Sequence, residues 1–315
     1  QVEAAAGLID EGNTIPFISR YRKEATGSLN DEELRKLFER LVYLRNLEEK
    51  KTQVLSVIEE QGKLTEELKK QLHAAQTLVA VEDLYRPYRP KRRTRATAAK
   101  EKGLDPLADL IMLQMTEKTL EQEAMAFVSE EKGVEDTGAA IQGAMDIIAE
   151  RISDEAEYRK RIRELSVKEG YICSEAKDET QNSVYEKYYH YTEPVTKAPG
   201  HRILAINRGE NEKILTVKLE VPEEKILDYL TRQVVVRDNP ATAPVLREAA
   251  ADSYHRLIAP AIEREIRNEL TERAEDGAIT LFGKNLEQLL MQPPIAGETV
   301  LGLSRKHRIP PELRS

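Results

Sequence analysis

Apolar residues recur at steps of three and four along most of this 315-residue chain, which is the spacing of helices with one buried face. The longest such run lies between Pro244 and Gln292, where positions four residues apart are apolar. Residues 214–219 instead alternate between apolar and polar side chains, as a half-buried strand does. The pattern therefore predicts a mainly α protein with a multi-helix N-terminal region, a small β element and a long central helix.

Capping residues and loop-forming residues divide the first part of the chain. Asn30 or Asp31 caps a long helix, because both side chains accept hydrogen bonds from the first helical turn. Thr65 starts the next predicted helix, which runs toward Leu84. We interpret residues 12–28 (GNTIPFISRYRKEATGS) as a connector with one apolar side and one basic side.

Helix breakers and aromatic residues shape the second part. Pro260 lies inside the longest periodic run and predicts a kink or an interruption there. Gly277 and Gly283 predict a second weak point in the same helix. Four tyrosines cluster around His190, and we interpret them as half-buried core beside the strands rather than as a stacking surface.

Positive charge is concentrated in Leu84–Gly103, which we call the basic segment. It holds eight basic residues and one acid, a net charge of +7, whereas the whole chain carries −8. A patch of this density repels itself unless it is solvated or meets a polyanion such as a phosphate backbone. Tyr85 and Tyr88 offer ring faces for base stacking. Pro87 and Pro90 are expected to hold the residues before them extended and exposed.

Two other interpretations of the basic segment stay open: an internal electrostatic clamp onto acidic helices, and a merely solvated loop. The basic residues of 12–28 raise a similar choice between ligand contact and a structural connector. The predicted nucleic-acid-binding residues of both stretches are Tyr85, Arg86, Tyr88, Arg89, Lys91, Arg92, Arg93, Arg95, Lys100, Arg20, Arg22 and Lys23.

Catalytic chemistry is not evident in the sequence. The five histidines have no Cys or carboxylate partners at zinc-like spacing, so we predict no metal site. Gly283-Lys284-Asn285 lacks the rest of a phosphate-binding loop, and Cys173 has no obvious His partner. We therefore expect no catalytic residues, no cofactor and no enzyme activity. No apolar run approaches the roughly 20 residues of a membrane span, so we expect a cytoplasmic protein with no membrane partner.

Five stretches together carry a family resemblance: TIPFISRYRKEATG (14–27), EEQGKLT (59–65), EDLYRPYRPKRRTRATAAKEKGLDPLAD (82–109), HRILAINRGENEKIL (201–215) and AITLFGKNLEQLL (278–290). With them the chain closely resembles the N-terminal part of the bacterial Tex family of transcription accessory proteins, distant relatives of a eukaryotic transcription elongation factor. The resemblance implies a helix-turn-helix-like subdomain and a long central helix. It also implies that a ribonuclease H-like domain, helix-hairpin-helix elements and an OB-fold RNA-binding barrel lie outside this chain.

The resemblance and the patterns together give a domain division. We expect a helical Tex-like region at 1–170, a small α/β element at 171–240 and the long central helix at 241–303. Residues 304–315 depart from the family pattern, and we interpret them as a non-family tail. Because the chain starts inside a helical pattern, we interpret it as a fragment of a longer protein.

The expected function is that of a non-enzymatic helical scaffold of a Tex-like transcription accessory protein that contributes to binding of RNA or DNA. The alternative is a protein-interaction module that docks RNA polymerase or ribosomal partners. The charge asymmetry and the resemblance favour the first.

Overall fold

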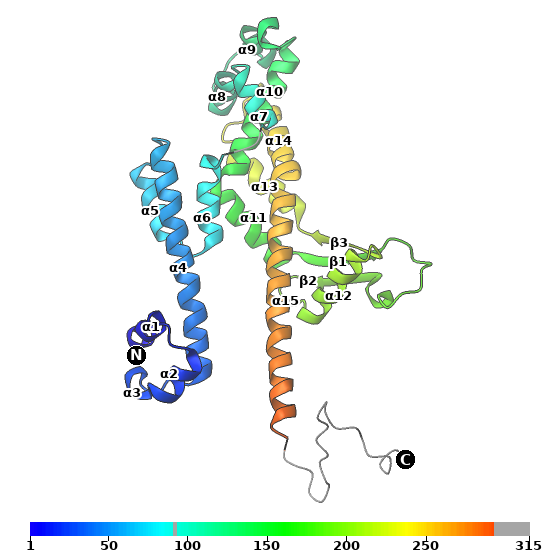
Figure 1. The fold of residues 1–315 in the computed structure, drawn as a ribbon. Coiled ribbons are helices and arrows are strands. Elements are labelled where there is room, and N and C mark those ends of the chain that lie inside the picture. Colours follow the sequence, from blue (N-terminus) through cyan, green and yellow to red (C-terminus); the bar gives the residue numbers. More distant parts are fainter. Residues whose placement is uncertain (91–92, 293–315) are drawn as a thin grey trace, which may run out of the picture.

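The computed structural model describes residues 1–90 and 93–292, and it is mainly helical with one small sheet (Figure 1). This confirms the predicted fold class. The expected tail at 304–315 lies outside the described residues, as do Lys91 and Arg92. The α-helices of the first half are α1 (Val2–Asp10), α2 (Ile15–Tyr21), α3 (Lys23–Thr26), α4 (Asp31–Glu60), α5 (Glu66–Ala74), α6 (Leu78–Tyr85), α7 (Arg95–Glu101), α8 (Asp105–Leu113), α9 (Leu120–Ala124) and α10 (Thr137–Asp154).

The N-terminal helices pack around the first half of α4. Asn30 and Glu33 form the capping box that starts this helix, which confirms the predicted cap. Ala5, Ile18 and Leu34 are fully buried where α1, α2 and α4 meet. The prediction of a connector at 12–28 was wrong, because most of this stretch forms α2 and α3. Proline is well tolerated in the first turn of a helix, and Pro16 is the second residue of α2.

The second half of α4 packs with α5 and α6 around a separate core that comprises Leu47, Val54, Ile58, Leu68, Leu72 and Val81. The single helix expected from Thr65 to Leu84 is divided into two. It breaks after Ala74, and the Thr77 hydroxyl then accepts a hydrogen bond from the Ala80 amide at 3.2 Å to begin α6. The break lets α6 change direction and reach the central region.

The backbone of the basic segment is less extended than predicted. Arg86 is helical and begins the 3₁₀ turn η1 (Arg86–Tyr88), so the expectation that Pro87 pushes it out of the helical region was wrong. A proline in the first turn of a helix lacks only a donor that would have no partner there. Arg89, before Pro90, is extended as expected. Thr94 then caps α7, and Gly103 follows that helix with a positive φ.

The largest core lies in the central region, where α10 is covered on several sides. Its buried residues include Ala144, Ile147 and Ile148, and α7, α8 and α14 pack on it. The remaining elements of this region are α11 (Ala156–Glu169), α12 (Gly200–Asn211), α13 (Glu223–Val234), α14 (Ala243–Asp252), α15 (Ala259–Leu290) and the short 3₁₀ turns η2 (Met125–Phe127), η3 (Glu130–Lys132) and η4 (Glu186–Tyr188).

The small β element is an antiparallel sheet in the order β2 (His190–Pro194), β1 (Tyr171–Ala176), β3 (Leu215–Glu220). Ser174 pairs with Tyr191 on one side and Val217 on the other. In the tyrosine cluster, Tyr185, Tyr189 and Tyr191 are buried in the main core, which supports their structural interpretation.

The long central helix is interrupted near Pro260, as predicted. A π-helical segment, η5 (Ser253–Ile258), joins α14 to α15, and Pro260 stands in the first turn of α15. Because proline lacks an amide hydrogen, it cannot continue a regular α-helical ladder. The wider turn before it allows the chain to remain helical across the proline.

The second predicted weak point was wrong. The α15 helix continues through Gly277 and Gly283 without a break. Two exposed glycines each disfavour the helix by only about 1 kcal/mol relative to alanine, which neighbouring helix formers offset. Every residue from 275 to 292 is exposed, and Figure 1 shows this distal half of α15 running past the sheet with none of the described elements packed on it.

We predict that Gly277→Ala and Gly283→Ala each slow amide exchange in the distal half of α15 by roughly 2- to 5-fold, because alanine favours a helix over glycine. An added Cβ meets nothing within 4 Å at either position. Gly200→Ala is the contrasting control, since its Cβ would lie 3.1 Å from the Cα of Ala274 and should lower the thermal midpoint. Faster exchange in the Gly277 and Gly283 variants would contradict the model of an unsupported regular helix.

Candidate functional site

The basic segment faces acidic side chains along most of its described length. Arg89 pairs with Glu82 at 3.8 Å, and Arg93 pairs with Glu101 at 2.9 Å. The Arg89 and Arg93 side chains are nevertheless 66% and 75% exposed. Exposed pairs of this kind contribute about 0–1 kcal/mol and open readily. Both cations therefore stay accessible to a solvent-borne anion.

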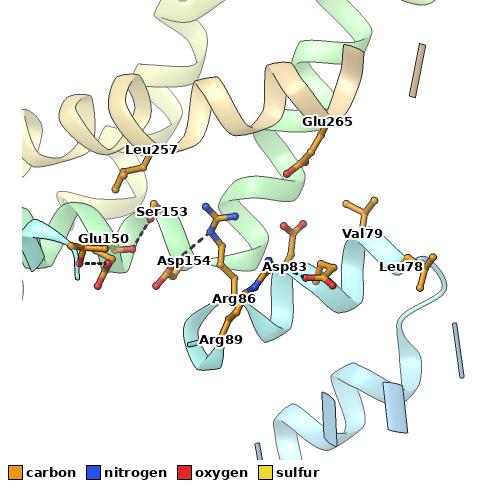
Figure 2. Close-up of a pocket in the computed structure, with 12 residues that line it drawn as sticks. Leu78, Val79, Asp83, Arg86, Arg89, Glu150, Ser153, Asp154, Leu257 and Glu265 are labelled. Carbon is orange, nitrogen blue, oxygen red and sulfur yellow. Dashed lines mark hydrogen bonds and ion pairs between the residues drawn. The ribbon is translucent and has the colours of Figure 1, made fainter. Parts of the chain in front are cut away.

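Arg86 is placed differently, because its side chain points into a pocket of about 490 Å³ between α6, α10 and α15 (Figure 2). Its Nε lies 3.5 Å from Asp154, whose side chain is mostly buried. Burial lowers the pKa of Arg86, the charge of Arg159 lowers it further, and Asp154 acts in the opposite direction. Of the interpretations left open above, an internal clamp describes Arg86 best.

The two tyrosines of the basic segment pack against the core of α4, α5 and α6. The ammonium of Lys50 lies 5.9 Å from the ring centre of Tyr85. Gln61 of α4 donates a hydrogen bond to the carbonyl oxygen of Tyr88 at 2.9 Å. Neither ring is freely exposed, so both tyrosines help to attach η1 to the end of α4.

The outward surface of the basic segment is formed by α7. Arg95 and Lys100 of α7 are exposed, as is Arg93 just before the helix, although Lys100 lies 3.7 Å from Glu150. Thr94 also donates a hydrogen bond to Glu150 at 3.1 Å, which fixes the start of α7 against α10. The structure thus holds the backbone of α7 firmly while its basic side chains face solvent.

The other predicted cations, Arg20, Arg22 and Lys23, lie on a distant surface at the turn between α2 and α3. They are exposed, and within residues 1–90 and 93–292 they form no ion pair. This turn packs near the start of α4, whereas η1 lies near its end (Figure 1). A 30-residue helix is about 45 Å long. The predicted residues therefore form two separate surfaces.

Beside the pocket lies a buried charge network that the sequence did not reveal: Asp83 of α6, Arg159 and Arg163 of α11, and Glu265 of α15. Arg159 is fully buried and donates to Asp83 at 2.8 Å and to Glu265 at 2.7 Å. Arg163 donates to the same two carboxylates at 2.9 and 2.8 Å. We refer to these four residues as the charge network.

The two carboxylates of the charge network act on the pKa of Arg163. Burial alone lowers the pKa of Arg163, but the carboxylates of Asp83 and Glu265 outweigh that effect and leave the pKa raised. The only sequence signal was the spacing of two arginines four residues apart in a charged helix. That signal is common on solvated helix faces, so it does not identify a buried pair.

Other chemistry is sparse in the part of the chain that the structure describes. No group of three or more His, Cys, Asp or Glu side chains there is arranged to hold a metal ion. Cys173 is buried in β1, and burial raises the pKa of its thiol. Among the described helices, none has the length and apolar character of a membrane span.

Two family models match the chain. The Tex-like protein N-terminal domain matches residues 1–59, and the Tex central region matches residues 116–282, which is more than half of the chain. The chain belongs to the Tex family. This confirms the resemblance found in the sequence.

Curated relatives agree with the Tex assignment. The protein YdcI of Bacillus subtilis is 48% identical over 98% of this chain and 43% of its own length. The transcriptional accessory protein Tex of Neisseria gonorrhoeae is 40% identical over 98% of this chain and 41% of its own length. Human S1 RNA-binding domain-containing protein 1 is 31% identical over 94% of this chain and 31% of its own length. The chain thus spans about two fifths of the bacterial relatives it matches.

The matched stretches give the charge network a place in the Tex architecture. Asp83 and the whole basic segment lie in residues 60–115, between the two models, whereas Arg159, Arg163 and Glu265 lie inside the central region. The network therefore ties the connecting helices to the Tex central region.

We predict that Asp83→Asn lowers the free energy of unfolding by about 3–5 kcal/mol, because removing one partner leaves buried arginines undercompensated. The matched control is Glu82→Gln, whose side chain is 42% exposed and should cost less than about 1 kcal/mol. Urea unfolding followed by circular dichroism measures both. Equal losses for the two variants would show that the charge network does not hold α6 in place.

Proposed function

We propose that this chain is a non-enzymatic helical scaffold of a cytoplasmic Tex-like transcription accessory protein, and that it contributes to binding of RNA or DNA. Membership of the Tex family supports the transcription role, since one relative is named a transcriptional accessory protein and another an S1 RNA-binding domain-containing protein. The observation that carries the binding proposal is the exposure of basic side chains on α7 and at the α2–α3 turn.

The two basic surfaces differ in the ion pairs that must break before their side chains can bind phosphate. At the α7 surface a guanidinium group must break a weak ion pair with a surface carboxylate before it binds phosphate, as Arg93 must with Glu101. At the α2–α3 turn the cations have no ion-paired acid among the described residues that they would have to release. Thr94 caps α7, and the α2–α3 turn is closed by the left-handed Gly27 and by the Ser28 amide, which donates to the Lys23 carbonyl, so little ordering of the protein is needed on binding. Lys91 and Arg92 remain predictions of the sequence for the same site.

The arrangement of these surfaces supports the proposed scaffold role. The α4 helix separates them by roughly the length of a 30-residue helix, and the charge network fixes α6 to the central region. Such a frame can hold phosphate contacts apart at a set distance along a strand. It contributes geometry and charge rather than chemistry.

We predict that replacing Arg93, Arg95 and Lys100 with Gln weakens binding to a 40-nucleotide RNA and flattens its salt dependence. Each lost phosphate contact should reduce the slope of log affinity against log salt by roughly 0.7–0.9. A second variant replaces Arg20, Arg22 and Lys23 with Gln. Fluorescence anisotropy at several salt concentrations, with RNA and with single- and double-stranded DNA, measures the slopes.

The control for that experiment removes the same charge elsewhere, by Arg208→Gln, Arg232→Gln and Lys218→Gln together. These side chains are exposed and lie on the central region. If the control variant loses as much affinity and slope as the two test variants, binding reflects overall charge and the assignment of either surface is wrong.

A second proposal, protein docking onto RNA polymerase or ribosomal partners, is favoured by one observation. The distal half of α15 exposes large apolar side chains, with Ile279 and Phe282 each 69% exposed. Leu286 and Leu289 continue the same face at steps of four and three residues. A contiguous exposed apolar face often marks a protein interaction site.

We predict that Phe282→Ser with Leu286→Ser abolishes binding of this chain to purified RNA polymerase or ribosomes in the presence of nuclease. The control, Lys284→Ser, changes an exposed residue two positions from each of them and should bind as the unchanged chain does. Surface plasmon resonance measures the affinities. Nuclease-sensitive binding, or binding that survives the double substitution, would exclude docking through this face.

A further inference from the structure

The turn between α2 and α3 is held in one shape by buried contacts. Thr26 is fully buried, and its hydroxyl donates to the carbonyl oxygens of Arg22 and Lys23 at 3.2 and 3.4 Å. The Ser28 amide donates to the Lys23 carbonyl at 2.7 Å, and Gly27 between them adopts a left-handed conformation. Ile18 anchors the other side of the turn in the core. The side chains of residues 20–23 therefore project from a rigid base.

An aromatic side chain stands at the centre of this turn. Tyr21 ends α2 and is 67% exposed, although tyrosine rings are usually at least half covered in folded proteins. Its ring centre lies 5.3 Å from that of Phe17, which supports it from one side. The Arg22 guanidinium lies 5.4 Å from the Phe17 ring centre, so it packs against the ring that supports Tyr21. The ring is thus positioned by neighbours while most of its surface meets solvent.

Positive charge surrounds this ring. A shallow pocket of about 350 Å³ is lined by Arg20, Tyr21, Arg22, Lys23, Glu24 and Ala25. Three of these residues are basic and one is acidic, and in the described chain the three cations form no ion pair. A supported ring beside unneutralised cations can bind a base by stacking and hold the adjoining phosphates.

The shape of the turn favours single strands over duplexes. A helix that reads the major groove presents several side chains along its length, but α3 has only four residues and α2 has seven. The bases of a duplex are also stacked on each other, so their faces are not available to a tyrosine ring. We propose that the α2–α3 turn is a stacking site for a base of single-stranded nucleic acid, with Tyr21 as the platform and Arg20 and Lys23 as phosphate contacts. This inference rests on the nucleic-acid binding proposed above.

The test compares Tyr21→Ala with Tyr21→Phe in the full chain. The probes are ten-nucleotide oligothymidylate, oligouridylate, the same deoxy chain with abasic positions throughout, and a ten-base-pair duplex. We expect Tyr21→Ala to weaken binding of both base-bearing single strands by roughly 5- to 150-fold, which is the usual range for one lost stacking contact. Tyr21→Phe keeps the ring and should bind within about 2-fold of the unchanged chain.

The abasic strand separates stacking from a structural effect of the substitution. It keeps the phosphates and lacks the bases, so Tyr21→Ala should leave its affinity and that of the duplex unchanged. Circular dichroism should show the same helix content for both variants. Relative affinity for the thymidylate and uridylate strands shows whether DNA or RNA is the preferred single strand.

Three results would overturn the inference. Equal losses for base-bearing and abasic strands would mean that Tyr21 supports the turn rather than stacks. Loss of affinity in the Arg20, Arg22 and Lys23 variant without any effect of Tyr21→Ala would refute stacking and leave the proposed function intact. A chain that binds none of the probes at low salt would contradict both the inference and the nucleic-acid function.

Discussion

Asp83, Arg159, Arg163 and Glu265 form the contact on which the arrangement of this chain depends. Two arginines of α11 are held between a carboxylate of α6 and a carboxylate of α15, so helices distant in sequence are fixed by directional bonds. Burying such charges is costly, and Nη1 of Arg159 finds no partner among the described residues. The network therefore specifies a geometry more than it adds stability, since other docking angles would leave these charges unpaired.

The basic surfaces take their positions from this frame. Because α6 is fixed through Asp83, the 3₁₀ turn that follows directs Arg86 inward to Asp154, and α7 is then placed with its arginines outward. The α2–α3 turn is carried independently by the other end of α4. A cluster that looks uniform in sequence thus separates into an inward clamp and outward contacts. This division explains why net charge alone does not define a binding site.

Sequence patterns predicted the helix starts well where a capping residue precedes a periodic run, as at Asn30 and Thr65, and Pro260 marked the interruption of the long helix. They failed where the outcome depended on contacts between distant segments. Nothing local distinguishes Asp83 and Glu265 from the other acids of a chain with 56 of them, yet each of the two meets both Arg159 and Arg163. The exposure of Tyr21 was equally hidden, because tyrosine is intermediate between the residue types that are usually buried and those that are usually exposed. Residues 12–28 were missed as helices because their glycines and proline resemble loop signals.

Native-state hydrogen exchange tests the central role of the charge network most directly. If the network couples the connecting helices to the Tex central region, the slowest amides of α6 and α11 will exchange with the same free energy, in one cooperative opening. If α4, α5 and α6 instead open together at a much lower free energy while α10 and α11 stay protected, the two parts are independent units and the account is wrong.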